Sequence, residues 1–399
     1  MALRDTINKI VPIKEDFSLK TLLSFEKTPL NMLVAFMIVG LTVMMVLGVI
    51  YFFMHGHHAY NVTREHPWGL MIASYAFFVG VSTGLCIIGS FGHLFGMKEF
   101  NIIGTRTTFL AIVTLLAGFA IIIFEIGHPI TMMIYNVLSP GITSAIWWMG
   151  TLYGLVITLL LVEFVFILRG NHKWSKIFGM GGLVADVAAF STLGSVFGYL
   201  VSRSYANGPF YPVYFILTAI VAGAFFLFVI YGFKYKLNFP KEIEVFLVKL
   251  AKILGLLLAV LIFLEYWRTI TAIYGRMPER ADTMLHVVQT TNFQLEVLFG
   301  MIIPFLVILF SKGKAIKATV FTSLGGIISI FFMRNSMVHN VQIFPMQTLK
   351  KTEYQLVPTW IEYFPSATEI MISVGAVGLC LFLYFLGTKL FNLEDNAHH

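Results

Sequence analysis

The chain has 399 residues, of which 58% are hydrophobic and only 12% are charged. Soluble domains carry roughly twice that share of charged residues, so the composition excludes an ordinary soluble globular domain. Lys and Arg number 27 against 20 for Asp and Glu, which gives a net charge of +7. Because the cations are spread over loops and terminal segments, we interpret the charge as membrane topology and contact with anionic lipids, not as nucleic-acid binding.

Long apolar runs separated by short polar breaks predict an all-α, polytopic integral membrane protein with about ten transmembrane helices. About 20 apolar residues cross a bilayer core, and a helix pairs all of its backbone groups within the span. The expected helices cover residues 31–53, 69–95, 106–126, 143–168, 181–202, 211–232, 246–270, 291–311, 316–334 and 367–389.

The polar residues 1–30 are expected to remain as a cytoplasmic N-terminal segment, because they are too long for the start of a cleaved signal peptide. We divide the rest into helices one to six, residues 31–240, helices seven to ten, residues 241–390, and a C-terminal tail, residues 391–399. Most Lys and Arg residues fall in every second break, on the side of the N-terminal segment. The positive-inside rule therefore predicts that both termini lie in the cytoplasm.

Ionisable residues within the spans are costly in lipid, so each one is a candidate for function. Glu125 ends the third predicted helix beside His128, at the outer face, and Glu265 lies one turn inside the end of the seventh helix. Arginines end helices five, seven and nine at the same face: Arg203, Arg268 and Arg334. The inner halves of helices two, four and five carry His93, Glu163 and Asp186.

The outer ends of helices two to five thus gather hydroxyl, carboxylate, imidazole and guanidinium groups. A quinone ring needs an apolar slot, a few hydrogen-bond partners and a titratable group for proton exchange. We predict catalytic roles in proton exchange for Glu125 and His128. The predicted quinone-binding residues are Tyr75, Ser82, Thr83, Trp148 and Arg203. The predicted proton pathway toward the cytoplasm is His93, Glu163 and Asp186.

Structural roles are the alternative at each of these positions. Glu125 can pair with an arginine at the headgroup level, and Trp148 can belong to the aromatic belt of the membrane interface. Hydroxyl side chains in a membrane helix often bond back to the carbonyl four residues earlier.

Cys86 and Cys380 are the only cysteines, and both lie within apolar runs. An iron–sulfur cluster needs about four thiolates, and a transmembrane haem pair needs facing histidines at matched depth. His93 is the one histidine that falls clearly within a predicted span. We therefore expect neither an iron–sulfur cluster nor a haem in this chain, and no bound metal.

Several short motifs, taken in order, resemble the NrfD/PsrC family, the membrane subunits of polysulfide-reductase-like complexes. In the first half they are residues 67–84, residues 125–129 (Glu-Ile-Gly-His-Pro) and residues 139–153 with Trp147 and Trp148. In the second half they are Tyr211-Pro212, Arg334-Asn335 and residues 363–375. The second-half motifs are similar to the ten-helix branch of that family.

The resemblance implies a quinone-reactive subunit of the inner (cytoplasmic) membrane, with menaquinone or ubiquinone as bound substrate and no redox cofactor of its own. It implies a bundle of helices two to five that holds the quinone near the periplasmic face. A periplasmic ferredoxin-like iron–sulfur subunit would dock there, with a multihaem cytochrome c or a molybdopterin-type subunit as further partners. Ser82 or Thr83 falls where some members have a histidine, and coupling to proton translocation differs between members.

Two other functions remain open from the residues alone. Intramembrane Glu, Asp and Arg suit a proton-coupled transporter, although such carriers are often built of inverted repeats and none is evident here. A membrane anchor without quinone chemistry is the third candidate.

Overall fold

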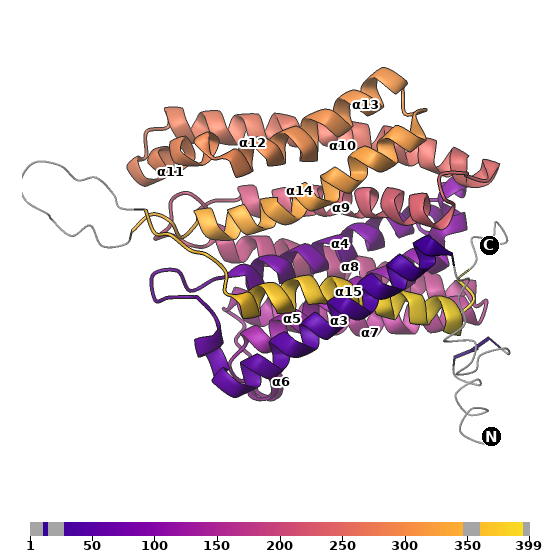
Figure 1. Ribbon diagram of the computed structural model, residues 1–399, viewed down its shortest axis with the longest axis horizontal. Coiled ribbons are helices and arrows are strands. Elements are labelled where there is room, and N and C mark those ends of the chain that lie inside the picture. Colours follow the sequence, from indigo (N-terminus) through magenta and orange to yellow (C-terminus); the bar gives the residue numbers. More distant parts are fainter. Residues whose placement is uncertain (1–10, 15–27, 346–359, 394–399) are drawn as a thin grey trace, which may run out of the picture.

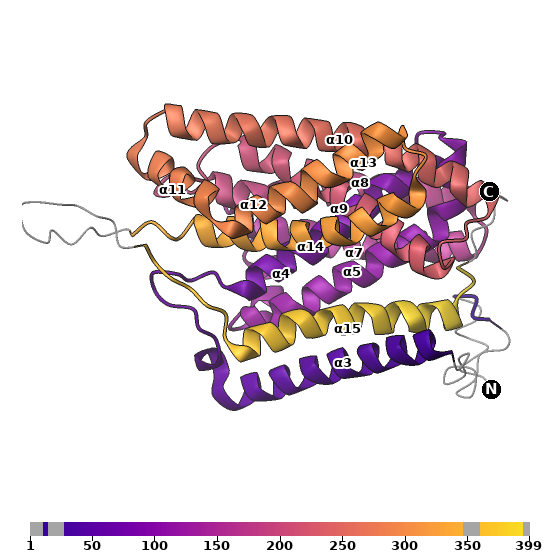
Figure 2. The ribbon, with the colours of Figure 1, turned by 45° about the horizontal axis from the view of Figure 1, so that its top comes forward.

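The computed structural model describes residues 11–14, 28–345 and 360–393 of the chain. Within these ranges ten helical stretches are long and apolar enough to cross a membrane, and no β-strand occurs. The stretches run side by side along the long axis of the molecule (Figures 1 and 2). The prediction of an all-α, polytopic membrane protein is confirmed.

The ten stretches are formed by eleven long or paired helices, and two short helices lie between them. The long helices are α3 (Pro29–His55), α4 (Leu70–His93), α5 (Gly104–Glu125), α7 (Ala145–Leu168), α8 (His172–Gly198), α9 (Phe210–Lys234), α10 (Lys241–Tyr274), α14 (Ile316–Asn340) and α15 (Ala367–Leu390). One stretch joins α12 (Thr291–Val297) to α13 (Ile303–Ser311) through a turn of π-helix. The short helices are α6 (Pro129–Leu138) and α11 (Pro278–Gln289).

Two helix boundaries differ from the predicted ones in a way that moves candidate residues. α8 begins at His172, well before residue 181, because the Asn171 side chain caps it by accepting from the Trp174 amide at 3.3 Å. It ends at Gly198, so Arg203 lies in the following loop and not at a helix end. α14 continues to Asn340, so Arg334 lies inside the helix. Its polar last turns pack against protein, and polarity therefore does not end it.

The helices form two bundles and one pair. The first bundle consists of α4, α5, α7 and α8, and the second consists of α9, α10, α12–α13 and α14. α3 and α15 pack together and lie along α5 (Figure 2). Two clusters of buried apolar side chains follow this division, one centred on the first bundle and one on the second.

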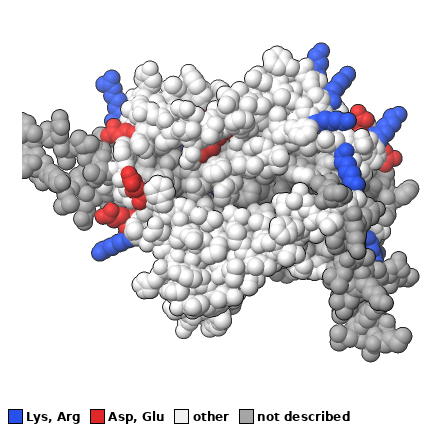
Figure 3. All heavy atoms as spheres, viewed as in Figure 1, with Lys and Arg blue, Asp and Glu red and all other residues white. Residues whose placement is uncertain are grey.

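The two ends of the molecule differ in charge. We call the end where α3 begins and α15 ends the terminal end, and the opposite end the loop end. Lys and Arg side chains gather mainly at the terminal end (Figure 3). This distribution is the one that the positive-inside rule uses to predict a cytoplasmic terminal end.

A close crossing of α4 and α9 joins the two bundles. A Cβ atom on Gly84 would lie 1.9 Å from the Ala219 carbonyl oxygen, and one on Gly223 would lie 2.5 Å from the Gly84 carbonyl carbon. Only glycine lets two backbones approach this closely, as at other small-residue contacts between membrane helices. The crossing thus fixes how the second bundle sits on the first.

We predict that Gly84→Ala destabilises the protein by about 1–3 kcal/mol or more, because the added methyl group forces α4 and α9 apart. Gly154→Ala in α7 is the matched control, since nothing lies within 4 Å of its added Cβ. Thermal unfolding of the purified protein in detergent measures both. Equal midpoints for the two variants would contradict the prediction.

Candidate functional site

Two buried carboxylates lie near each other at the loop end, and they differ in how they are bonded. Glu369, in the first turn of α15, accepts from the Asn61 amide at 3.0 Å, from the Ser366 amide at 2.8 Å and from the Tyr363 hydroxyl. Glu125, the last residue of α5, keeps its Oε2 atom buried with no hydrogen-bond partner among the described residues. Glu369 is therefore satisfied as a structural group, while Glu125 retains a free acceptor.

Tyr60 sits beside this carboxylate pair. Its hydroxyl donates to the Phe124 carbonyl at 3.0 Å, next to Glu125. Burial raises the pKa of Tyr60, and the nearby charges of Glu125 and Glu369 raise it further. Tyr60 therefore stays protonated and donates a hydrogen bond throughout the physiological range.

A pair of histidines closes the loop end above α4. The His66 Nε2 and His339 Nδ1 atoms lie 2.9 Å apart, and the His66 ring stacks on Tyr363 with centroids 4.4 Å apart. The Tyr363 hydroxyl accepts from the Leu70 amide at 2.7 Å, at the start of α4. Burial, with His339 and then Arg203 nearby, lowers the pKa of His66 to about 4.

His66 gives a prediction about stability and pH. In the unfolded chain a histidine has a pKa of about 6.5. Below that pH the unfolded state binds a proton that folded His66 refuses until about pH 4, so stability falls as the pH drops through this window. We expect His66→Gln to flatten the decline of the thermal midpoint between pH 6.5 and pH 4.5.

His58→Gln, at an exposed histidine of the same loop, is the control and keeps the wild-type slope. A slope in His66→Gln equal to that of the wild type would remove His66 from this dependence.

The other residues predicted for the loop end are more exposed. His128 precedes α6 and is exposed, as is Trp148, whose Nε1 donates to the Ile142 carbonyl at 2.7 Å. Arg203 donates to the Phe344 carbonyl, and this bond ties the α8–α9 loop to the segment after α14. Its place near His66, and not within the first bundle, makes it a neighbour of the histidine pair.

Tyrosines form the next layer of the first bundle. Tyr75 of α4 and Tyr153 of α7 are buried and meet edge to face, with ring centroids 6.2 Å apart. Phe119 of α5 packs edge-on against the same Tyr153 ring. The Tyr153 hydroxyl has no hydrogen-bond partner among the described residues, and it interacts electrostatically with Asp186.

Asp186 of α8 lies deeper in the same bundle and is 1% exposed. It accepts from the Thr83 hydroxyl at 2.7 Å and from the Cys86 thiol, while its Oδ2 atom has no partner in the described structure. Cys86 and Glu163 line a cavity of about 10 Å³ toward the terminal end. We call Tyr75, Tyr153, Asp186, Cys86 and Glu163 the polar ladder.

Two predicted residues fall outside the polar ladder. The Ser82 hydroxyl donates to the Ala111 carbonyl at 2.8 Å, so it bonds α4 to α5. His93 ends α4, and its side chain lies outside the described part of the structure.

Arg334 lies between the two bundles and is 1% exposed. Its Nη2 donates to the Thr218 hydroxyl at 2.5 Å, and its guanidinium carbon lies 4.1 Å from the centre of the Phe215 ring. Its Nε and Nη1 atoms have no partner among the described residues. A buried guanidinium with free donors is costly, and such a group is commonly retained for function.

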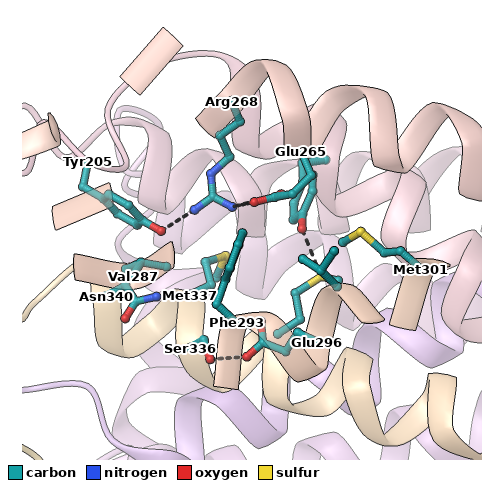
Figure 4. Close-up of a pocket in the computed structure, with 13 residues that line it drawn as sticks. Tyr205, Glu265, Arg268, Val287, Phe293, Glu296, Met301, Ser336, Met337 and Asn340 are labelled. Atoms are coloured by element: carbon teal, nitrogen blue, oxygen red, sulfur yellow. Dashed lines mark hydrogen bonds and ion pairs between the residues drawn. The ribbon is translucent and has the colours of Figure 1, made fainter. Parts of the chain in front are cut away.

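The second bundle holds a polar pocket near the loop end (Figure 4). Arg268 of α10 bonds both carboxylate oxygens of Glu265, at 2.9 and 3.1 Å, and also donates to the Tyr205 hydroxyl. Glu296 of α12 accepts from the Ser336 hydroxyl across the same cavity of about 20 Å³, which is room for about one water molecule. The pocket thus contains one compensated ion pair and one further carboxyl group.

Sequence reasoning identified Glu265 and Arg268 as neighbours but missed Glu296, Ser336 and Tyr205. An acidic residue within the apolar run 291–311 was the signal for Glu296. Nothing in the sequence indicates that Tyr205, in a loop, turns toward α10.

Comparisons with known proteins agree with this arrangement. The chain is 24% identical to a selenate reductase membrane protein of Mesobacillus selenatarsenatis over 393 aligned residues, covering 84% of this chain and 89% of that protein. It is 23% identical to the Hdr-like menaquinol oxidoreductase integral membrane subunit of Archaeoglobus fulgidus over 349 residues, covering 84% and 86%. The family model described as "Polysulphide reductase, NrfD" matches residues 57–346, and the chain therefore belongs to the NrfD family.

Proposed function

We propose that the chain is the quinone-reactive membrane subunit of a multisubunit respiratory oxidoreductase. Electrons would pass between a quinol at the loop end and an iron–sulfur subunit docked on that face. The name of the relative from Archaeoglobus fulgidus, a menaquinol oxidoreductase subunit, supports a quinone as the reaction partner. A menaquinone or a ubiquinone fits the proposal, as do cytochrome c and molybdopterin-type subunits further along the chain of electron transfer.

The free Oε2 atom of Glu125 is the observation that carries the proposal. It lies at the end of the first bundle, within reach of a molecule that enters from the outer leaflet, and its neighbour Glu369 is already saturated. A quinol that gives up two electrons must also release two protons. A buried carboxylate with an unused acceptor can bind the quinol hydroxyl and take the first of these protons.

The exposed His128, three residues further along the chain, is proposed to pass that proton to the aqueous side. In the direction of quinone reduction the same groups would deliver protons to the ring oxygens. Tyr75 and Trp148 would contribute apolar surface to the slot.

The polar ladder is proposed as the proton route toward the terminal end, which the charge distribution predicts to be cytoplasmic. Asp186 and Tyr153 each keep an oxygen atom without a partner in the described structure, so water can bridge them. Glu163 continues the route beyond Cys86. Net proton translocation would follow if protons taken up through this route were released at the loop end.

We expect Glu125→Gln to lower the quinol turnover of the assembled complex about a hundredfold, the usual contribution of a positioned acid or base. The amide keeps the shape of the side chain but cannot take a proton. Glu65→Gln, at an exposed residue of the adjacent loop, is the matched control. Turnover within twofold of the wild type in Glu125→Gln would remove Glu125 from the mechanism.

Asp186→Asn tests the proton route separately. We expect turnover to fall about tenfold and the solvent deuterium isotope effect on it to rise, because proton transfer then limits the rate. Thr114→Val is the control, since Thr114 is buried in the same bundle and bonds only carbonyls of its own helix. An unchanged isotope effect in Asp186→Asn would place the proton route elsewhere.

Purification of the intact complex tests the class of function. We expect retained quinone and a co-purifying iron–sulfur subunit, in the cytoplasmic membrane. Proton-coupled solute uptake into vesicles that contain this chain alone would favour a transporter, and a complex that turns over fully without quinone would favour an anchor.

A further inference from the structure

A cavity of about 280 Å³ opens at the terminal end of the first bundle, remote from the proposed quinone site. It lies where α5 begins, α7 ends and α8 begins. Its polar lining comes from Asn101, Thr105, His172, Ser175 and Lys176.

The charge around this cavity is positive. Arg169, Lys173 and Lys176 surround the turn from α7 to α8, and no acidic residue occurs in the sequence between Glu163 and Asp186. Lys176 has no ion-pair partner among the described residues. On the turn before α5, the acidic Glu99 is already paired with Lys249 at 2.8 Å. The partial positive charge at the start of α8 adds to the attraction for an anion.

The lining also contains an unused acceptor. The Asn101 Oδ1 atom is buried and has no hydrogen-bond partner among the described residues. A bare phosphate ion near neutral pH has few protons to offer such an atom, whereas a hydroxyl group can donate to it. The cavity therefore suits a ligand that carries both a phosphate and a hydroxyl group.

The cavity lies at the level of a membrane interface. Trp174, at the start of α8, is half exposed and stacks with Phe166 and Phe178, an arrangement typical of the aromatic belt. Exposed apolar side chains continue from there along α7 and α8, among them Leu161, Ile177 and Val184. Acyl chains can lie along this face while the headgroup occupies the cavity.

We propose that this cavity binds the glycerol–phosphate headgroup of an anionic phospholipid such as phosphatidylglycerol. Lys176 and the start of α8 hold the phosphate, Thr105 and Ser175 donate hydrogen bonds to it, and Asn101 accepts from the headgroup hydroxyl. Basic pockets between transmembrane helices on the cytoplasmic side bind anionic lipid headgroups by the same chemistry. The bound lipid links the ends of α5, α7 and α8.

The test uses the intact complex, stripped of lipid in detergent. Phosphatidylglycerol, phosphatidic acid, phosphatidylcholine or inorganic phosphate is then added, and native mass spectrometry measures lipid bound while thermal unfolding measures stability. We expect phosphatidylglycerol to bind and to raise the unfolding midpoint, with no effect of phosphatidylcholine. Inorganic phosphate at matched concentration leaves the midpoint unchanged, because it lacks the acyl chains and the hydroxyl group.

Variants locate the effect. Lys176→Gln should weaken phosphatidylglycerol binding about fivefold, the expected loss for one lysine at a membrane surface. Lys176→Glu should weaken it further. Lys173→Gln removes a charge on the same turn that does not line the cavity, and it should retain most of the binding. Asn101→Leu should abolish the preference for phosphatidylglycerol over phosphatidic acid.

Three results would overturn the proposal. They are equal losses in the variants of Lys176 and Lys173, a stabilisation by phosphatidylcholine equal to that by phosphatidylglycerol, and a stabilisation by inorganic phosphate equal to that by the lipid. The last would show a simple anion site. Because all readouts are binding and stability, they are independent of quinol turnover.

Discussion

Hydrocarbon offers no hydrogen bonds, so a polar atom within this protein must find its partner in the protein, in trapped water or in a bound molecule. Most buried polar groups of the described residues obey this constraint through short local bonds. Hydroxyl groups donate to carbonyls of their own helices, as Thr114 and Thr218 do, and Glu369 is saturated by two amides and a hydroxyl group. Against this background, the few atoms that lack a partner stand out as places built to receive something.

Those atoms are not scattered at random. Glu125 Oε2 lies at the loop end of the first bundle, and Tyr153 and Asp186 lie successively deeper between the same four helices. The second bundle has a different character, because its arginine and two carboxylates are compensated within one small pocket. Arg334 lies between the bundles, interacts electrostatically with Tyr153 and keeps two free donors, so it is the residue through which a charge in one bundle can affect the other.

The sequence predicts the all-α fold, the ten spans and the family, because hydropathy and short ordered motifs are local properties. It also identifies Glu125, Glu163 and Asp186, since an acidic residue within an apolar run is conspicuous in itself. It does not reveal that Glu369 is satisfied while Glu125 is not, because their partners Asn61 and Tyr363 come from distant loops. In the same way, the position of Arg334 inside α14 depends on protein surrounding a polar turn, which hydropathy interprets as the end of a span.

The central claim is that the free carboxylate oxygen of Glu125 receives a quinol. A cryo-electron microscopy structure of the assembled complex with menaquinol or a tight-binding analogue tests this most directly. We expect a ring oxygen within hydrogen-bonding distance of Glu125, roughly 2.6–3.2 Å, between the loop ends of α4, α5 and α7. A ring bound elsewhere, with Glu125 paired to an arginine of a partner subunit, would contradict the account.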